Sequence, residues 1–106
     1  MGNFSGGMNE LLRQAARMQR KVEQVKKECG DKEVSATAVG DKVRATVTYS
    51  CKVSRIEVDP GFLESEGLEL TLDSVCAAIN AALETAQKGM DAEVAKVTGG
   101  AKIPGL

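Results

Sequence analysis

Apolar positions along the chain follow a helical period first, a strand period next and a helical period again. From Met8 to Cys29 they recur at steps of three and four residues, and Gly30 ends the pattern. This spacing predicts a first helix with one narrow apolar stripe, which needs a partner surface. The stripe consists of Met8, Leu11, Leu12, Ala15, Met18, Val22, Val25 and Cys29. Residues 1–7 are rich in glycine, so we expect this N-terminal segment to be disordered.

Three short segments then have strand character. Residues 34–39 are β-branched or small and run into Gly40-Asp41, a dipeptide suited to a two-residue hairpin turn. Residues 43–49 alternate strictly between apolar and polar, which predicts a sheet with one buried face. In residues 51–58 the alternation slips by one residue near Ser54-Arg55, so we expect a bulge there.

A second long helix is expected after an acidic loop that contains Glu64, Glu66 and Glu69. Thr71 can cap it, and Gly99-Gly100 ends it. Its apolar stripe is Leu72, Val75, Cys76, Ile79, Leu83, Ala86, Met90, Val94 and Val97. The opposite side carries Ala77, Ala81, Ala92 and Ala95. These alanines either admit a partner at close range or are simply good helix formers in an exposed position.

The order of these elements predicts an α+β fold, α-β-β-β-α, with a three-stranded antiparallel sheet between two long helices. Residues 8–98 form the single domain, and residues 99–106 are a C-terminal tail. Only 3% of the residues are aromatic and the chain has no Trp, so a core of this size is thin. Oligomerisation is a natural way to bury more surface.

Residue types that support catalysis are scarce in this chain. It has no His, and its three cysteines, Cys29, Cys51 and Cys76, are too widely spaced for a metal set. The acidic loop is expected to be solvated, and no glycine-rich motif fits a nucleotide-binding loop. We therefore expect no catalytic site, no metal site, no cofactor and no small-molecule substrate. The N-terminus resembles no signal peptide and no apolar run could span a membrane, which favours a cytoplasmic protein without a membrane partner.

Charge is distributed very unevenly. The formal net charge is −1, which by itself argues against binding to nucleic acid. Residues 1–27, however, hold six basic and two acidic residues, a net charge of +4, whereas residues 56–93 hold one basic and nine acidic residues, a net charge of −8. Around the first helix Arg13, Arg17, Arg20 and Lys27 fall within about 80°, nearly opposite the apolar stripe. Such a face is more often plain solvated surface, and Glu10, Glu23 and Glu28 could neutralise part of it.

Four short motifs, in order along the chain, resemble those of the YbaB/EbfC family of bacterial nucleoid-associated DNA-binding proteins. They are Leu-Leu-x-Gln-Ala-x-x-Met-Gln at residues 11–19, Ile-Glu-Val-Asp-Pro at 56–60, Ala-Ile-Asn-Ala-Ala at 78–82, and Thr-Gly-Gly at 98–100 followed by Ile-Pro-Gly-Leu at 103–106. The chain departs from the family pattern at Ser50-Cys51 and at Gly67-Leu68-Glu69. Both departures lie in expected loops and leave the fold expectation unchanged.

This resemblance implies a homodimer formed through the sheets, with long helices that project like the arms of tweezers. It implies double-stranded DNA as the partner and a role in nucleoid organisation and gene regulation. Mapped onto this sequence, the DNA-binding candidates are Arg13, Arg17, Arg20, Lys21, Lys26, Lys27, Lys88, Lys96 and Lys102. An alternative hypothesis is a protein-interaction adaptor in replication or repair that uses the alanine-rich helix face and the acidic loop.

Overall fold

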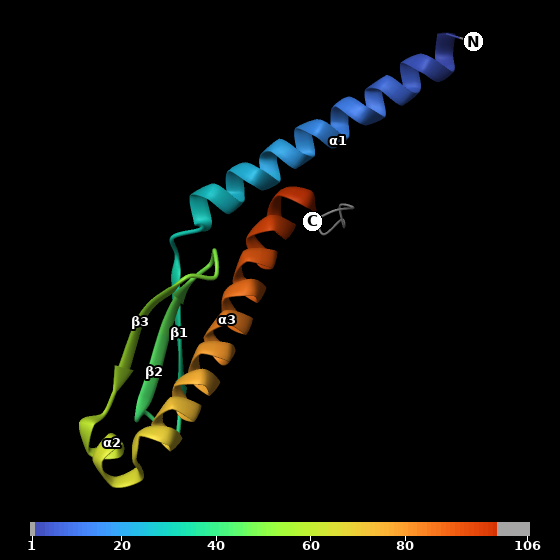
Figure 1. The fold of residues 1–106 in the computed structure, drawn as a ribbon. Coiled ribbons are helices and arrows are strands. Elements are labelled where there is room, and N and C mark those ends of the chain that lie inside the picture. Colours follow the sequence, from blue (N-terminus) through green and yellow to red (C-terminus); the bar gives the residue numbers. More distant parts are fainter. Residues whose placement is uncertain (1, 100–106) are drawn as a thin grey trace.

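The computed structural model describes residues 2–99, with side chains from residue 7 onward, and it has an α+β architecture (Figure 1). The elements follow one another as helix, three strands, short helix and long helix. The predicted fold class is therefore confirmed. Their bounds are α1 Gly2–Cys29, β1 Glu33–Ala38, β2 Val43–Thr48, β3 Val53–Val58, α2 Pro60–Glu66 and α3 Leu68–Thr98.

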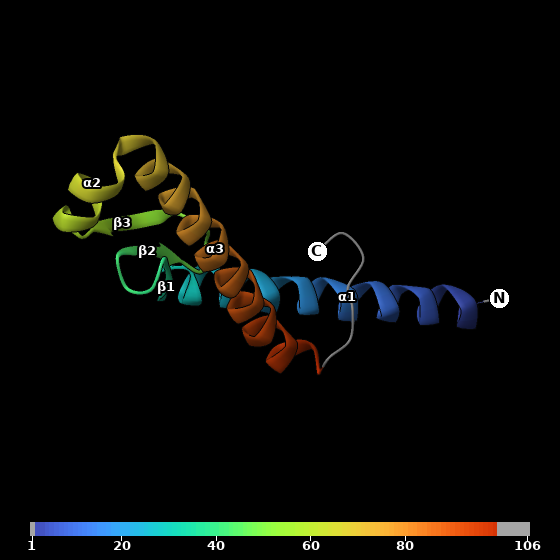
Figure 2. The ribbon, with the colours of Figure 1, turned by 90° about the horizontal axis from the view of Figure 1, so that it is seen from below.

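The strands form one antiparallel sheet in the order β1-β2-β3. In β2 the side chains of Val43, Ala45 and Val47 are fully buried, as the alternation predicts. The pairing of β2 with β3 shifts between Thr46 and Val47, which leaves Ser54 as the extra residue and confirms the expected bulge. The sheet lies between the two long helices along the chain, but in space α3 covers one of its faces, while α1 packs against α3 (Figures 1 and 2).

Small side chains on α3 make the contact with the sheet. Ala78, Ala82 and Ala86 are fully buried against Val43, Ala45 and Val47. At steps of four residues they form a continuous row, and their size lets the helix backbone lie close to the strands. The large residues Val75, Ile79 and Leu83 flank this row and are only partly buried. The side of α3 that faces the sheet is therefore rotated from the predicted apolar stripe, and Leu72 is 54% exposed.

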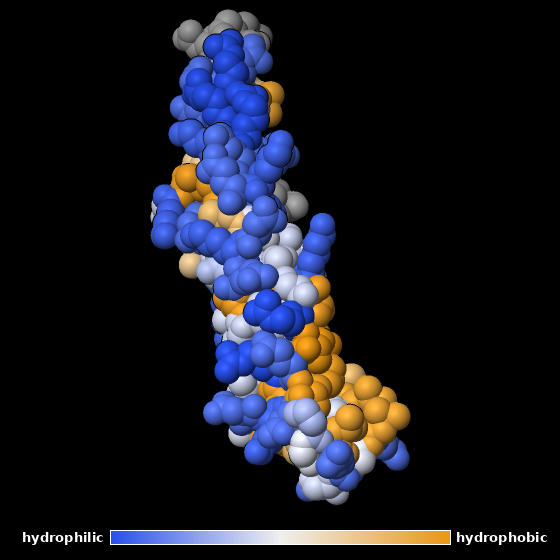
Figure 3. Space-filling view, turned by 90° about the vertical axis from the view of Figure 1, so that its left-hand side faces the viewer, coloured by the Kyte–Doolittle hydropathy of each residue, from blue (hydrophilic) through white to orange (hydrophobic). Residues whose placement is uncertain are grey.

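Strand β3 lies at an edge of the sheet that α3 barely reaches. Val53 and Ile56 pair with the buried face of β2, yet they are 49% and 37% exposed. Leu63, Leu68 and Leu72 are also exposed. Figure 3 shows hydrophobic surface gathered at the end of the molecule away from the N-terminus. An apolar surface of this kind is typical of an interface.

Two expectations about the segment between β3 and α3 need correction. The acidic loop is mostly helical: α2 begins at Pro60, with Asp59 as its N-cap, and α3 begins at Leu68 rather than at Thr71. The Asp59 side chain accepts a hydrogen bond from the Gly61 backbone N–H at 2.9 Å, and a proline at the first helical position is already shaped for a helix. Thr71 lies inside α3, where its hydroxyl donates to the Gly67 carbonyl at 2.7 Å.

The hairpin and the start of the first helix also differ from expectation. Ala38 pairs with Val43, so four residues connect β1 to β2, and both Val39 and Gly40 have positive φ. Helix α1 begins at Gly2 rather than at Met8, and the disorder expected for residues 1–7 stays a prediction. No proline interrupts that segment, and each glycine in a helix costs only about 1 kcal/mol. The division of the chain at residues 8 and 99 stays a prediction.

The molecule is strongly elongated, with extents of 76 × 20 × 17 Å. The N-terminal part of α1 projects beyond the rest of the chain in both ribbon views (Figures 1 and 2). We call the part of α1 up to Lys27 the arm, and we call the sheet with α2 and α3 the body. Within residues 2–99, neither long helix is apolar enough to cross a lipid bilayer.

Candidate nucleic-acid interface

The arm is held to the body only near its C-terminal end. Val22 is fully buried and Val25 is partly buried, because this part of the stripe packs against α3. Further out, Met8, Leu11 and Leu12 are 59–63% exposed. The arm therefore presents its outer side to solvent along its whole described length.

All six basic candidates on α1 are exposed, so none is buried by packing against the rest of the chain. The two nearest the N-terminus share one carboxylate: Glu10 lies 3.7 Å from the Arg13 guanidinium and 3.5 Å from that of Arg17. The side chains in both pairs are at least half exposed, so water screens them and each contributes at most about 1 kcal/mol. One carboxylate between two guanidinium groups leaves a local positive charge.

Four further cations lie closer to the body. Within the described part of the chain, no carboxylate lies within ion-pair distance of Arg20, Lys21, Lys26 or Lys27. Glu28, which could have paired with them, instead accepts a hydrogen bond from the Gln24 amide at 3.0 Å. These four side chains are thus available to an anionic ligand.

The lysines of α3 are in a different situation. Lys88 pairs with Glu84 at 3.3 Å and Lys96 pairs with Glu93 at 3.1 Å, both within α3. Their charge is partly neutralised before any ligand arrives. Lys102 lies outside the described residues. The nine candidates therefore do not form one uniform surface, and the strongest positive charge is on α1.

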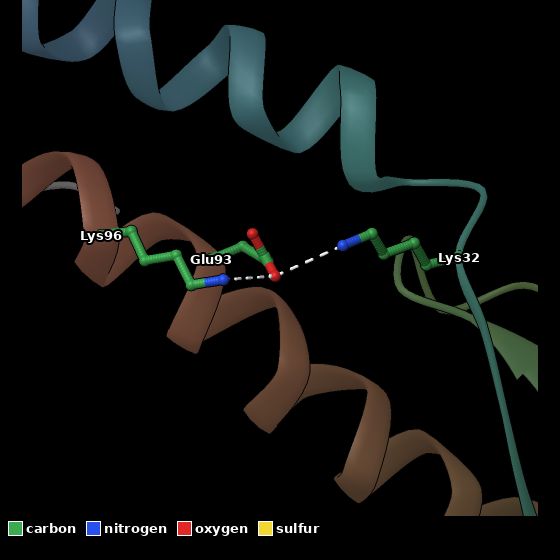
Figure 4. Close-up of polar contacts among 3 residues, drawn as sticks. All are labelled: Lys32, Glu93 and Lys96. Atoms are coloured by element: carbon green, nitrogen blue, oxygen red, sulfur yellow. Dashed lines mark hydrogen bonds and ion pairs between the residues drawn. The ribbon is translucent and has the colours of Figure 1, made fainter.

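An ion pair with a mostly buried carboxylate restrains the base of the arm relative to α3. The Glu93 carboxylate accepts from Lys32 at 3.3 Å and from Lys96 at 3.1 Å, and its side chain is only 19% exposed (Figure 4). The hydrogen bonds from Lys96 and Lys32 lower the pKa of Glu93, and the same carboxylate raises the pKa of Lys32. Lys32 follows the end of α1 by three residues, so this contact restrains the connection from which the arm projects.

The ring of Tyr49 packs against the same region of α3. It lies 5.9 Å from the Lys32 ammonium, and a Cβ added at Gly89 would approach its Cζ to 2.6 Å. Gly89 thus makes room for the ring. Sequence reasoning missed both contacts, since Lys32 and Glu93 are 61 residues apart. The one available signal was a glycine inside a long helical pattern.

Negative charge collects at the opposite end of the molecule. Glu64, Glu66 and Glu69 lie on α2 and on the first turn of α3, and all are exposed. Among residues 2–99, no group of acidic or cysteine side chains is arranged to hold a metal ion. The charge separation along the long axis leaves the arm as the end that attracts anions.

Fold and charge together define a small α+β protein with a basic helical arm, and the comparisons with known proteins agree with this class. A family model described as the YbaB/EbfC DNA-binding family matches residues 4–101. The chain belongs to the YbaB/EbfC DNA-binding family.

Curated relatives carry consistent names. The chain is 36% identical to a nucleoid-associated protein of Clostridium acetobutylicum, over 99% of this chain and 94% of that protein. It is 37% identical to a nucleoid-associated protein of Thermoanaerobacter pseudethanolicus, over 99% of this chain and 96% of that protein. A crystal structure of a Helicobacter pylori protein has a similar fold, with a TM-score of 0.61 and 14% identity, over 73% of this chain and 89% of the other.

Proposed function

We propose that this protein binds double-stranded DNA as a homodimer in the bacterial cytoplasm and contributes to nucleoid organisation and gene regulation. The observation that carries the proposal is a set of four exposed cations on the arm that have no carboxylate within ion-pair distance among the described residues. Membership of a DNA-binding family supports it, as do the names of the relatives.

Phosphate contacts are the binding mode that these side chains favour. Lys and Arg neutralise backbone phosphates and release counterions, which is largely independent of base sequence. Stacking on unpaired bases needs exposed aromatic rings, but the described aromatics, Tyr49 and Phe62, are half-buried. The arm therefore suits a duplex better than a single strand.

The uncovered apolar surface beside β3 supports the homodimer. Val53, Ile56 and Leu72 are large apolar side chains left exposed by a core of small residues. A second copy placed against this surface would bury it, and the two arms would then present their cations to one duplex.

Charge reversal on the arm tests the proposal. We expect Arg20→Glu, Lys21→Glu and Lys27→Glu together to weaken duplex binding by on the order of 100-fold or more, because three attractive contacts become repulsive. The measurement is fluorescence anisotropy on a labelled duplex at several salt concentrations. A matched control reverses three exposed cations of the body, Lys52→Glu, Arg44→Glu and Arg55→Glu. If both triple variants lose the same affinity, or neither loses any, the arm is not the DNA-binding site.

A second candidate function is a protein-interaction adaptor in replication or repair. The exposure of Ala77, Ala81, Ala92 and Ala95 on α3 favours it, since small exposed residues admit close contact with another protein. Ala81→Lys and Ala92→Lys should leave DNA binding unchanged. If they abolish the protein's cellular role while DNA affinity persists, the adaptor function is the correct one.

A further inference from the structure

A heptad series of apolar residues runs along α1, and Leu12 and Ala16 are apolar positions outside it. Spacings of three and four alternate without exception through Met1, Phe4, Met8, Leu11, Ala15, Met18, Val22, Val25 and Cys29. An alternation of this kind over four heptads is the sequence signature of a coiled-coil seam. A helix that only lies on a globular body needs a broader and less regular stripe.

The body uses only half of this seam. Val22 is fully buried, and Met18, Val25 and Cys29 are partly buried beside α3. Met8, Leu11 and Ala15 continue the same seam but are exposed. Helix α3 ends at Thr98, so no part of residues 2–99 covers the outer half. An established helix–helix contact therefore continues into a seam without a partner.

Uncharged residues border the outer half of the seam. The flanking heptad positions hold Leu12, Gln14 and Gln19, whereas Arg13 and Arg17 point to the opposite side of the helix. Two identical seams can therefore approach each other without repulsion between like charges. A charged partner would find no complementary charge there, which favours a second copy of this chain.

We propose that the outer halves of two α1 seams pair as a short antiparallel coiled coil that joins two copies, and through them two DNA-bound dimers. Antiparallel pairing is required because α3 already occupies the seam from Met18 onward, so that parallel helices would force the two bodies together. In the antiparallel register Met8 of one copy lies beside Leu11 of the other. The basic faces of both helices then point outward, where they can bind DNA. This pairing goes beyond the proposed function because it links two duplexes.

The first experiment measures mass by sedimentation equilibrium over a range of concentrations at high salt. The wild-type mass is expected to double as the concentration rises. Leu11→Lys should raise the dissociation constant of this step by about 10-fold or more, because it places charge in the seam. Asn9→Lys adds the same charge on the same helical turn but off the seam, and the step should persist with little change.

The second experiment tests orientation by disulfide cross-linking. Met8→Cys and Leu11→Cys are made separately in a chain with Cys29→Ser, Cys51→Ser and Cys76→Ser. Mixing the two variants under mild oxidation is expected to give a covalent dimer, while each variant alone gives much less. Cross-linking of each variant with itself, with no mixed product between the two variants, would show parallel pairing and overturn the proposed arrangement.

Other outcomes are equally informative. A mass that never doubles, or a doubling that survives Leu11→Lys, would overturn the seam contact. Repeating the series with Ile56→Lys, which removes the proposed sheet-side dimer, separates this inference from the proposed function: the Leu11-dependent step should remain, starting from monomers.

Discussion

In the body, α3 lies on the sheet through Ala78, Ala82 and Ala86, all fully buried, whereas every described side chain of α1 from Met8 to Ala15 is exposed. In the body the backbones of α3 and the sheet pack closely, so a change of one methyl group there alters the free energy of unfolding. The outer arm makes almost no packing contacts within the chain, so its side chains are available to ligands. Stability and binding are thus assigned to different parts of an elongated molecule.

The largest difference between the two regions should appear with one substitution made in each. Ala82→Leu inserts three carbons between α3 and β2 and is expected to lower the free energy of unfolding by about 1–3 kcal/mol. Ala15→Leu lies on the exposed arm and should change it by less than about 0.5 kcal/mol. Urea denaturation at low protein concentration measures both. Equal effects would contradict the division between a packed body and an unpacked arm.

The packing of Tyr49 on α3 gives a sharper test inside the body. Gly89→Ala should bring a gain of about 1 kcal/mol from helix propensity, but the new Cβ would meet the Tyr49 ring at 2.6 Å. We expect the gain to appear in full only when Tyr49→Ala is also present. A double-mutant cycle on thermal unfolding measures this coupling, and additive effects would show that the ring does not press on Gly89.

A smaller effect is expected from the carboxylate on the arm. Glu10→Gln removes the shared partner of Arg13 and Arg17, so duplex affinity should rise by about 2- to 5-fold at low salt, with little effect at high salt. Glu84→Gln, which releases Lys88 on the body, is the control and should raise affinity less. A larger gain from Glu84→Gln would move the DNA-binding surface from the arm to α3.

The smallest effect concerns the contact at the base of the arm. Because the pKa of Glu93 is lowered from 4.5, its contribution to stability is present above that value and is lost as the pH falls through the lowered pKa. Because the pKa of Lys32 is raised from 10.5, its contribution is present below that value and is lost as the pH rises through the raised pKa. Glu93→Gln should therefore be less stable than wild type between these values, and the difference should vanish in acid. Thermal unfolding across pH checks this, with Glu84→Gln as the control.

Much of the fold could be predicted from local pattern. The alternation in residues 43–49 identified the buried face of β2, and the slip near Ser54 identified the bulge, because both depend on the two-residue period of a strand. Helix α2 was missed although Asp59-Pro60 is a helix-start signal, since the acidic residues after it suggested a solvated loop. In the candidate site, the exposure of the six α1 cations could be predicted from the sequence. Which of them form ion pairs with carboxylates could not.

The sequence by itself determined the order of the elements, the heptad on α1 and the separation of positive from negative charge along the chain, because these depend only on spacing and residue type. Only the tertiary structure decided which side of α3 meets the sheet, which cations have carboxylate partners and how far the arm extends beyond the body. Periodicity gives a side chain's direction around its own helix axis, but it does not reveal which other element lies in that direction. Contacts such as Lys32 with Glu93 join residues far apart in the chain, and they exist only once the body has folded.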